Sequence, residues 1–151
     1  MAEYSVVEVE ETYAFVARSS CKHEMLGDTI SDLIGRIIAA NPDADMVDAP
    51  RVYYTKWEQN SCEIEAAIPV TPGSQAMGGI EVKIYPATDA FTTTFVGPYT
   101  GLMEAWMAMW EEVNRLGLDA QGAPWDAYTP PGDDPEQNIT DLYIPVVIQK
   151  I

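Results

Sequence analysis

The tripeptide Ile-Pro-Val occurs twice in this chain, at residues 68–70 and at residues 144–146. The residue numbers of the two copies differ by a constant offset (144 − 68 = 76), and so do those of the carboxylates that precede them, Glu65 and Asp141. The same offset joins further identical residues: Val6 with Val82, Ala14 with Ala90, and Phe15 with Phe91. Because this offset is about half the length of the chain, the sequence predicts a duplicated structural unit.

The sequence predicts the order strand, helix, strand, strand twice, in one repeat over about 3–70 and another over about 80–149. Residues 71–79, rich in Gly, Pro and Ser, form the predicted linker. Apolar residues at spacings of three and four predict helices within 19–43 and 98–118. Runs rich in Val, Ile, Tyr and Thr predict the strands, over 3–17, 51–58, 61–70, 80–97, 123–129 and 139–149.

One repeat by itself leaves one side of its sheet uncovered, since a single helix covers only one face. Two repeats side by side form a larger antiparallel sheet. We therefore expect one α+β domain over residues 1–151, with two helices on one face of the sheet and a ligand cleft on the other. The length suits a single domain with a real core.

The formal net charge of −16 argues against direct binding of nucleic acid or anionic membranes, because phosphate contacts need a basic surface. It is compatible with cationic ligands, although an acidic surface is also common in soluble proteins. We see neither a long apolar span nor a signal peptide and expect a cytoplasmic protein. Cys21 and Cys62 are interpreted as reduced thiols, with a disulfide left open.

Strand alternation places the two repeat-related carboxylates on one side of the sheet. In 139–149 the aliphatic residues Leu142, Ile144 and Val146 share a face, which leaves Asp141 and Tyr143 on the other. In 61–70, by the same rule, Glu65 lies opposite the aliphatic face. We expect the aliphatic faces to meet the helices. Carboxylates on a solvated sheet face are the alternative interpretation.

Aromatic residues near these carboxylates favour a binding site. The candidates are Tyr53 and Trp57 on one predicted strand, Trp125 and Tyr128 on the corresponding strand, and Trp106 in the second helix. Aromatic rings around an acid suit a flat cationic molecule, with cation–π attraction of roughly 0.5–2 kcal/mol for each ring. For Trp106, packing into the core at helical spacing is the alternative.

Two segments, FVGPYTGLMEAWMAMWEEVNRLGL and PWDAYTPPGDDPEQNITDLYIPV, resemble the GyrI-like small-molecule-binding family. The shared pattern is a strand that ends in Gly-Pro-Tyr and opens a helix, then a closing strand with Thr, an acid, a hydrophobe and Tyr-Ile-Pro. The first half lacks the Gly-Pro-Tyr signature and has RSSCKHE instead. The resemblance implies a tandem strand-helix-strand-strand fold.

The resemblance also implies a function: binding of hydrophobic, cationic or amphipathic small molecules by a multidrug-type sensor or sequestering protein. It implies two alternatives, hydrolysis of cyclopropane-containing toxins by acidic and aromatic pocket residues, and a gyrase-inhibitor-like role with an unknown protein partner. For the hydrolase, a carboxylate in an apolar cleft is expected to have a raised pKa and to act as general acid or base. The family acid of the closing strand is usually Glu, and here it is Asp141. Glu65 is therefore the second candidate for the ligand-binding or catalytic acid.

No cofactor or metal is expected. His23 is the only histidine, too few for a zinc site of the usual kind. The phosphate-binding patterns GxxxxGK and GxGxxG are both missing from the sequence. A helix-turn-helix domain for direct DNA binding has no room beside the predicted fold.

Overall fold

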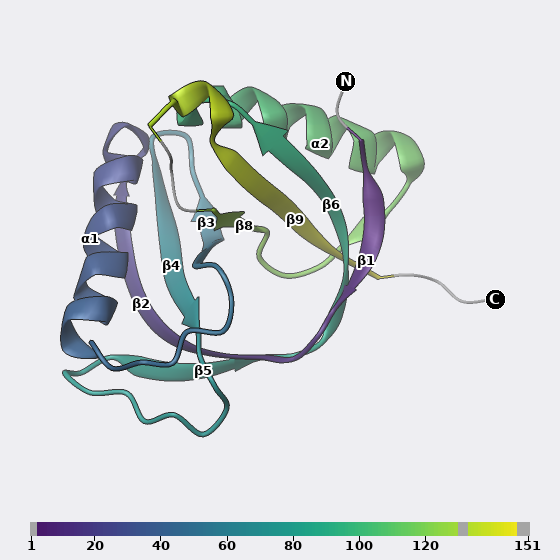
Figure 1. The fold of residues 1–151 in the computed structure, drawn as a ribbon. Coiled ribbons are helices and arrows are strands. Elements are labelled where there is room, and N and C mark those ends of the chain that lie inside the picture. The colour runs from purple at the N-terminus through teal and green to yellow at the C-terminus, as the bar shows by residue number, and fades with distance from the viewer. Residues whose placement is uncertain (1–2, 130–132, 148–151) are drawn as a thin grey trace. The chain divides into compact units, whose positions relative to one another are not determined.

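A computed structural model describes residues 3–129 and 133–147. The chain divides into two compact units, one formed by the described residues of 11–86 and the other by those of 1–10 and 87–151. By their place in the sequence alone, we call the unit of the middle residues the central unit and the unit of the two ends of the chain the outer unit. The strand pairings within both units are antiparallel, and each unit has one α-helix, so the predicted α+β class is confirmed (Figure 1).

The central unit has four strands in the order β3-β4-β2-β5. Its elements are β2 (Thr12–Lys22), α1 (Leu26–Ala40), β3 (Arg51–Trp57), β4 (Ser61–Pro69) and β5 (Glu81–Tyr85), with a short 3-10 turn at His23–Met25. Helix α1 packs against β2 and β4 (Figure 1). Leu33 and Ile37 of α1 and Ile64 and Ile68 of β4 are fully buried.

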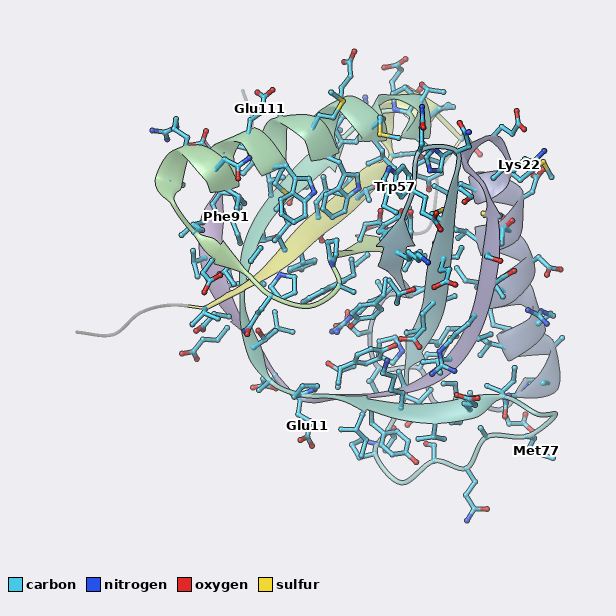
Figure 2. All side chains as sticks on the ribbon, turned by 180° about the vertical axis from the view of Figure 1, so that it is seen from behind. Glu11, Lys22, Trp57, Met77, Phe91 and Glu111 are labelled. Atoms are coloured by element: carbon cyan, nitrogen blue, oxygen red, sulfur yellow. The ribbon has the colours of Figure 1, made fainter. Side chains whose placement is uncertain are left out.

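The outer unit has the strand order β1-β6-β9-β8, with β7 also paired to β9. Its elements are β1 (Ser5–Val9), β6 (Thr88–Val96), α2 (Leu102–Leu116), β7 (Asp119–Ala120), β8 (Trp125–Tyr128) and β9 (Ile139–Val147), with 3-10 turns at Tyr99–Gly101 and Pro135–Gln137. Its core joins α2 to the sheet through Phe91, Met109, Val113, Leu142, Ile144 and Val146 (Figure 2). The aliphatic face of β9 thus meets a helix, as predicted.

Both helices end where the sequence indicates. Helix α1 stops before Asn41 and Pro42, and α2 stops before Gly117, whose φ of 67° is the left-handed conformation that glycine adopts without strain. The first residues of the two helices, Leu26 and Leu102, are related by the offset of the sequence pairs (102 − 26 = 76).

The long strands predicted over 3–17 and 80–97 are each broken in two. Residues 10–11 separate β1 from β2, and Pro86 and Ala87 separate β5 from β6. The two pieces of each run pair in different units: β1 with β6 in the outer unit, and β5 with β2 in the central unit. The compact units therefore differ from the predicted sequence repeats, whose boundaries remain a prediction.

Cys21 and Cys62 are free thiols that lie directly opposite each other on β2 and β4. Burial, and then the neighbouring Cys21, raises the pKa of Cys62 to about 11. Within 3–129 and 133–147, neither helix is long and apolar enough to cross a membrane.

Candidate functional site

Glu65 lies in the middle of the central unit, on the face of the sheet that α1 does not cover. The strand alternates, so Ile64 and Ala66 turn toward the buried helix side while Glu65 turns away from it. Across the neighbouring strands, Arg18 of β2 and Tyr53 of β3 stand directly opposite Glu65. Register thus brings an acid, a base and an aromatic ring into one row.

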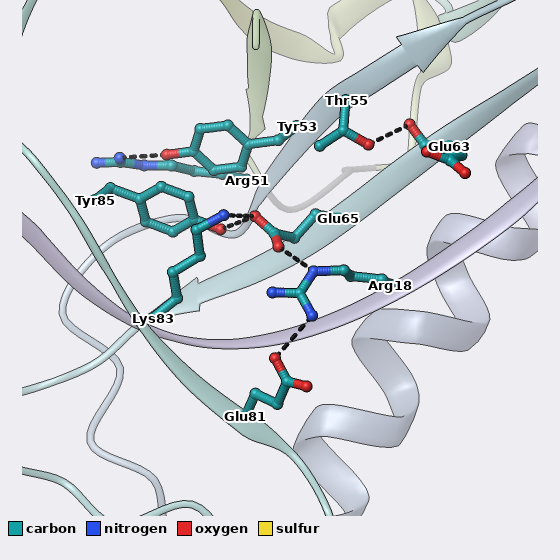
Figure 3. A network of polar contacts seen from close by, with 9 residues as sticks. All are labelled: Arg18, Arg51, Tyr53, Thr55, Glu63, Glu65, Glu81, Lys83 and Tyr85. Atoms are coloured by element: carbon teal, nitrogen blue, oxygen red, sulfur yellow. Dashed lines mark hydrogen bonds and ion pairs between the residues drawn. The ribbon is translucent and has the colours of Figure 1, made fainter. Parts of the chain in front are cut away.

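Three side chains donate hydrogen bonds to the Glu65 carboxylate. Arg18 Nε lies 2.6 Å from Oε1, Lys83 Nζ lies 3.0 Å from Oε2, and the Tyr85 hydroxyl lies 2.5 Å from Oε2 (Figure 3). Glu65 is only 1% exposed, whereas the side chains of Arg18 and Lys83 are 51% and 42% exposed. A buried anion is therefore held by two cations that still reach water.

The three donors decide the charge of Glu65. Burial opposes ionisation, but the hydrogen bonds together outweigh it and hold the pKa of the Glu65 carboxyl below its usual range. A carboxylate in an apolar cleft with a raised pKa is what the hydrolase hypothesis expects. For Glu65 that expectation is wrong, because two cations and a phenol converge on it from strands that sequence analysis did not pair with it.

Two stacked tyrosines flank the carboxylate. The rings of Tyr53 and Tyr85 lie 4.3 Å apart, 6° from parallel. Arg51 Nη1 donates to the Tyr53 hydroxyl at 3.1 Å. Burial, and then the hydrogen bond to Glu65, raises the pKa of Tyr85 above its usual value, so its hydroxyl remains a donor. We call Glu65, Arg18, Lys83, Tyr85 and Tyr53 the Glu65 network.

An open hollow of about 610 Å³ borders this network. It is lined by Arg36, Ala39 and Ala40 of α1, by Gly78 and Gly79, and by Arg18 and Glu81. Arg18 also bridges to Glu81, through an Nη1–Oε2 distance of 2.7 Å. The network thus reaches an exposed surface at its Arg18 side.

Asp141 lies in the outer unit and has a different environment. It is half-buried and accepts a hydrogen bond of 2.7 Å from the Thr94 hydroxyl. On the same face, Tyr143 stacks on Trp125 with ring centroids 4.9 Å apart and an angle of 10°. The structure therefore brings Asp141 and Tyr143 to one sheet face, as alternation predicted, and Trp125 lies on the same face.

Trp57 does not share the face of Tyr53. The register of β3 against β4 shifts between Tyr54 and Lys56, so Tyr53 opposes Glu65 but Trp57 opposes Cys62. This β-bulge reverses the alternation that the sequence predicted. Trp57, labelled in Figure 2, is 47% exposed. Its ring stacks on the His23 ring, at 4.1 Å between centroids.

Trp106 and Tyr128 lie on the helix side of the outer unit. Trp106 packs against the α2 core, which corresponds to the core alternative. Tyr128 opposes Thr140, so it points to the face opposite Asp141, and its ring makes an edge contact with Tyr99. Neither residue shares a sheet face with the carboxylate of its unit.

Sequence analysis missed Arg18, Lys83 and Tyr85. A partial signal existed, because Glu81, Lys83 and Tyr85 alternate along one short strand and share a face. Lys83 and Tyr85 reach Glu65 only because β5 pairs with β2, and the predicted repeats did not contain this pairing. Among residues 3–129 and 133–147, no group of three His, Cys, Asp or Glu side chains is arranged to hold a metal ion.

Residues 2–147 match the family model of the GyrI-like small molecule binding domain. Among solved structures, the EcmrR C-terminal domain aligns with a TM-score of 0.85 and 19% identity, over 97% of this chain and 98% of that one. In an EcmrR–DNA complex the alignment covers 96% of this chain and 57% of that one, with a TM-score of 0.85 and 20% identity.

Two further structures are similar. SAV2435 bound to tetraphenylphosphonium aligns with a TM-score of 0.75 and 9% identity, over 96% of this chain and 94% of that one. A hydrolase from Listeria innocua aligns with a TM-score of 0.66 and 12% identity, over 96% and 92%. At such low identity these likenesses show the fold alone. No curated protein matches the chain.

Proposed function

The chain belongs to the GyrI-like small molecule binding domain family, and on that basis we propose that it binds hydrophobic compounds that carry a positive charge. In this proposal it acts as a multidrug-type sensor or sequestering protein. The observation that carries the proposal is the Glu65 carboxylate, which is buried, ionised and next to two stacked tyrosine rings.

Each part of this arrangement matches one part of such a ligand. The ionised carboxylate attracts a positive charge, and the attraction is stronger in a place with little water. The Tyr53 and Tyr85 rings offer an aromatic surface for an apolar body and for cation–π contact. The structure of SAV2435 with tetraphenylphosphonium supports the ligand class, since that protein has the same fold and is bound to a lipophilic cation.

The second candidate surface is Trp125 and Tyr143 with Asp141 in the outer unit. It offers a stacked pair and a carboxylate, but Asp141 is less buried than Glu65. The hydrolase hypothesis has less support, since the pKa of Glu65 is lowered and an acid of low pKa is a weak general base. The gyrase-inhibitor-like role stays a prediction.

The test is calorimetric titration of the wild-type protein and Glu65→Gln with tetraphenylphosphonium, with the neutral compound triphenylphosphine oxide in parallel. We expect Glu65→Gln to weaken binding of the cation by about 10- to 100-fold, the usual effect of losing a charged partner. Binding of the neutral compound changes little. Equal affinity for the cation in both proteins would remove Glu65 from the site.

Glu63→Gln is the matched control. Glu63 lies two residues away on β4, on the same face as Glu65, but it is exposed. The substitution removes the same charge and leaves the Glu65 network intact. A loss of affinity in Glu63→Gln as large as in Glu65→Gln would indicate general surface attraction instead of a site.

A further inference from the structure

We propose that the Lys83 ammonium group occupies the position that a ligand's cationic group takes, so that a ligand binds only when Lys83 moves away. The inference rests on the proposed function, and it adds a residue that competes with the ligand for Glu65. Lys83 is thus a built-in competitor that sets the threshold for binding.

The contacts of Lys83 are those expected of a bound cation. Its Nζ atom lies 3.0 Å from Glu65 Oε2 and 5.0 Å from the centroid of the Tyr85 ring (Figure 3). The first contact is charge pairing with a buried carboxylate, and the second is a cation–π contact within the usual limit of about 6 Å. The chain therefore satisfies its own cation site with a side chain.

Lys83 can leave more easily than Arg18. Arg18 is held by two carboxylates, with Glu65 at 2.6 Å and Glu81 at 2.7 Å. Among the described residues Lys83 forms its ion pair with Glu65, and its side chain is already 42% exposed. The ammonium group sits on a flexible four-carbon stem, so it can rotate out into the solvent without any movement of the strand. Arg18 and Tyr85 then still hold Glu65 in place.

The exchange defines the class of ligand. A ligand that replaces Lys83 must bring one positive charge, since otherwise a buried carboxylate loses a partner. It must also carry an aromatic or apolar body that gains from Tyr53 and Tyr85, because a small cation would gain nothing over the lysine. Lipophilic monocations fit both requirements. A neutral aromatic compound fits only the second, so it is expected to bind more weakly than the cation.

Competition by Lys83 lowers the apparent affinity of the wild-type protein. A ligand binds only the fraction of molecules in which Lys83 has left, so the apparent Kd rises by the inverse of that fraction. Removing the ammonium group should therefore strengthen binding of a cation. This is the reverse of the result for a lysine that helps to bind the ligand.

The first experiment titrates Lys83→Met and wild type with tetraphenylphosphonium by calorimetry. We expect about two- to five-fold tighter binding by Lys83→Met, the range for removal of a competing, partly exposed ion pair. Lys22→Met is the matched control, because Lys22 is an exposed lysine at the end of β2 in the same unit. It makes the same change in net charge and should leave the affinity unchanged.

The gain must also depend on Glu65. In a Glu65→Gln background, the further substitution Lys83→Met should no longer strengthen binding. Unchanged or weaker binding by Lys83→Met, alongside a clear loss in Glu65→Gln, would overturn this inference and leave the proposed function standing. Binding that is indifferent to Glu65, or no binding at all, would overturn both.

A second experiment needs no variant. Lysine acetylation of the wild-type protein, followed by mass mapping of the modified residues, reports how accessible Lys83 is. If tetraphenylphosphonium displaces the ammonium group into water, acetylation of Lys83 rises when the ligand is present, while acetylation of Lys22 stays the same. Protection of Lys83 by the ligand would overturn the inference.

Discussion

Glu65 of the central unit and Asp141 of the outer unit hold matching places on matching strands. Each stands opposite a residue of the preceding long strand, Arg18 for Glu65 and Thr94 for Asp141, and these partners are related by the same offset (94 − 18 = 76). Yet Glu65 is almost fully buried with charged partners, whereas Asp141 is half-buried and accepts from a neutral hydroxyl.

The neighbouring strands account for the difference. The first residues of β5 and β1 are also related by this offset (81 − 5 = 76), and the two strands pair with β2 and β6 in the same way. Lys83 and Tyr85 of β5 supply donors to Glu65, while the corresponding residues of β1 are Val7 and Val9. Glu65 can be buried because the adjoining strand supplies a cation and a hydrogen-bond donor to its carboxylate. Asp141 has an apolar adjoining strand and stays closer to water.

The two units also differ in formal charge. The central unit, residues 11–86, contains six of the eight Lys and Arg residues and eleven of the 24 acids, a net charge of −5. The outer unit has the other two bases and thirteen acids, which gives −11. Cations are therefore concentrated in the unit that contains Glu65.

The largest expected effect is on stability when each carboxylate is removed. Glu65→Ala leaves two cations and a phenol without their shared acceptor, and we expect the free energy of unfolding to fall by about 2 kcal/mol. This is below the roughly 3–5 kcal/mol typical of fully buried pairs, because Arg18 and Lys83 are half exposed. Urea denaturation followed by circular dichroism measures the change.

Asp141→Ala is the counterpart in the outer unit. It should change the free energy of unfolding by no more than about 0.5 kcal/mol, as is usual for surface positions. Equal losses in the two variants would mean that the difference between the carboxylates has no energetic consequence.

A smaller effect is expected from removal of one donor. Tyr85→Phe keeps the ring stacked on Tyr53 but deletes the hydroxyl that donates to Glu65. We expect a loss of about 1.5 kcal/mol, the lower end of the range for one hydrogen bond to a charged group, because Arg18 and Lys83 still donate to the carboxylate. Tyr99→Phe, on an exposed ring of the outer unit, should be neutral within about 0.5 kcal/mol. Thermal unfolding of both variants distinguishes these outcomes.

The smallest effect concerns pH, since protonation removes only the charge. The pKa of Glu65 in the folded protein lies below its ordinary value of 4.5. The stability that its ionised form contributes is therefore complete above 4.5 and is lost as the pH falls through the lower, folded pKa. Wild type should exceed Glu65→Gln in stability near neutral pH, and the gap should close in acid.

Asp141→Asn is the control for this pH series of urea denaturations. Its difference from wild type should stay small throughout. A gap between wild type and Glu65→Gln that is constant down to the lowest pH studied would show that ionisation of Glu65 does not stabilise the fold.

Local sequence patterns were sufficient for the elements and for the orientation of several side chains. Periodic apolar residues located α1 and α2, and alternation placed Glu65, Asp141 and Tyr143 on the faces where they lie. These properties depend on neighbours within a few residues. The bulge that puts Trp57 on the opposite face from Tyr53 has no comparable signal in the sequence. One unpaired residue moves the side chains that follow it to the other face of the sheet without changing the composition of the strand.

Periodicity along the chain predicted the α+β class, and strand alternation indicated the acids worth testing. The family was predicted from the resemblance of two segments to a known sequence pattern. Only the folded chain shows that Glu65 is a buried anion with charged partners and that Asp141 is not. The difference depends on Arg18, Lys83 and Tyr85, which lie 47, 18 and 20 residues from Glu65 in sequence. Strand pairing brings such residues together, and burial then sets how strongly their charges interact.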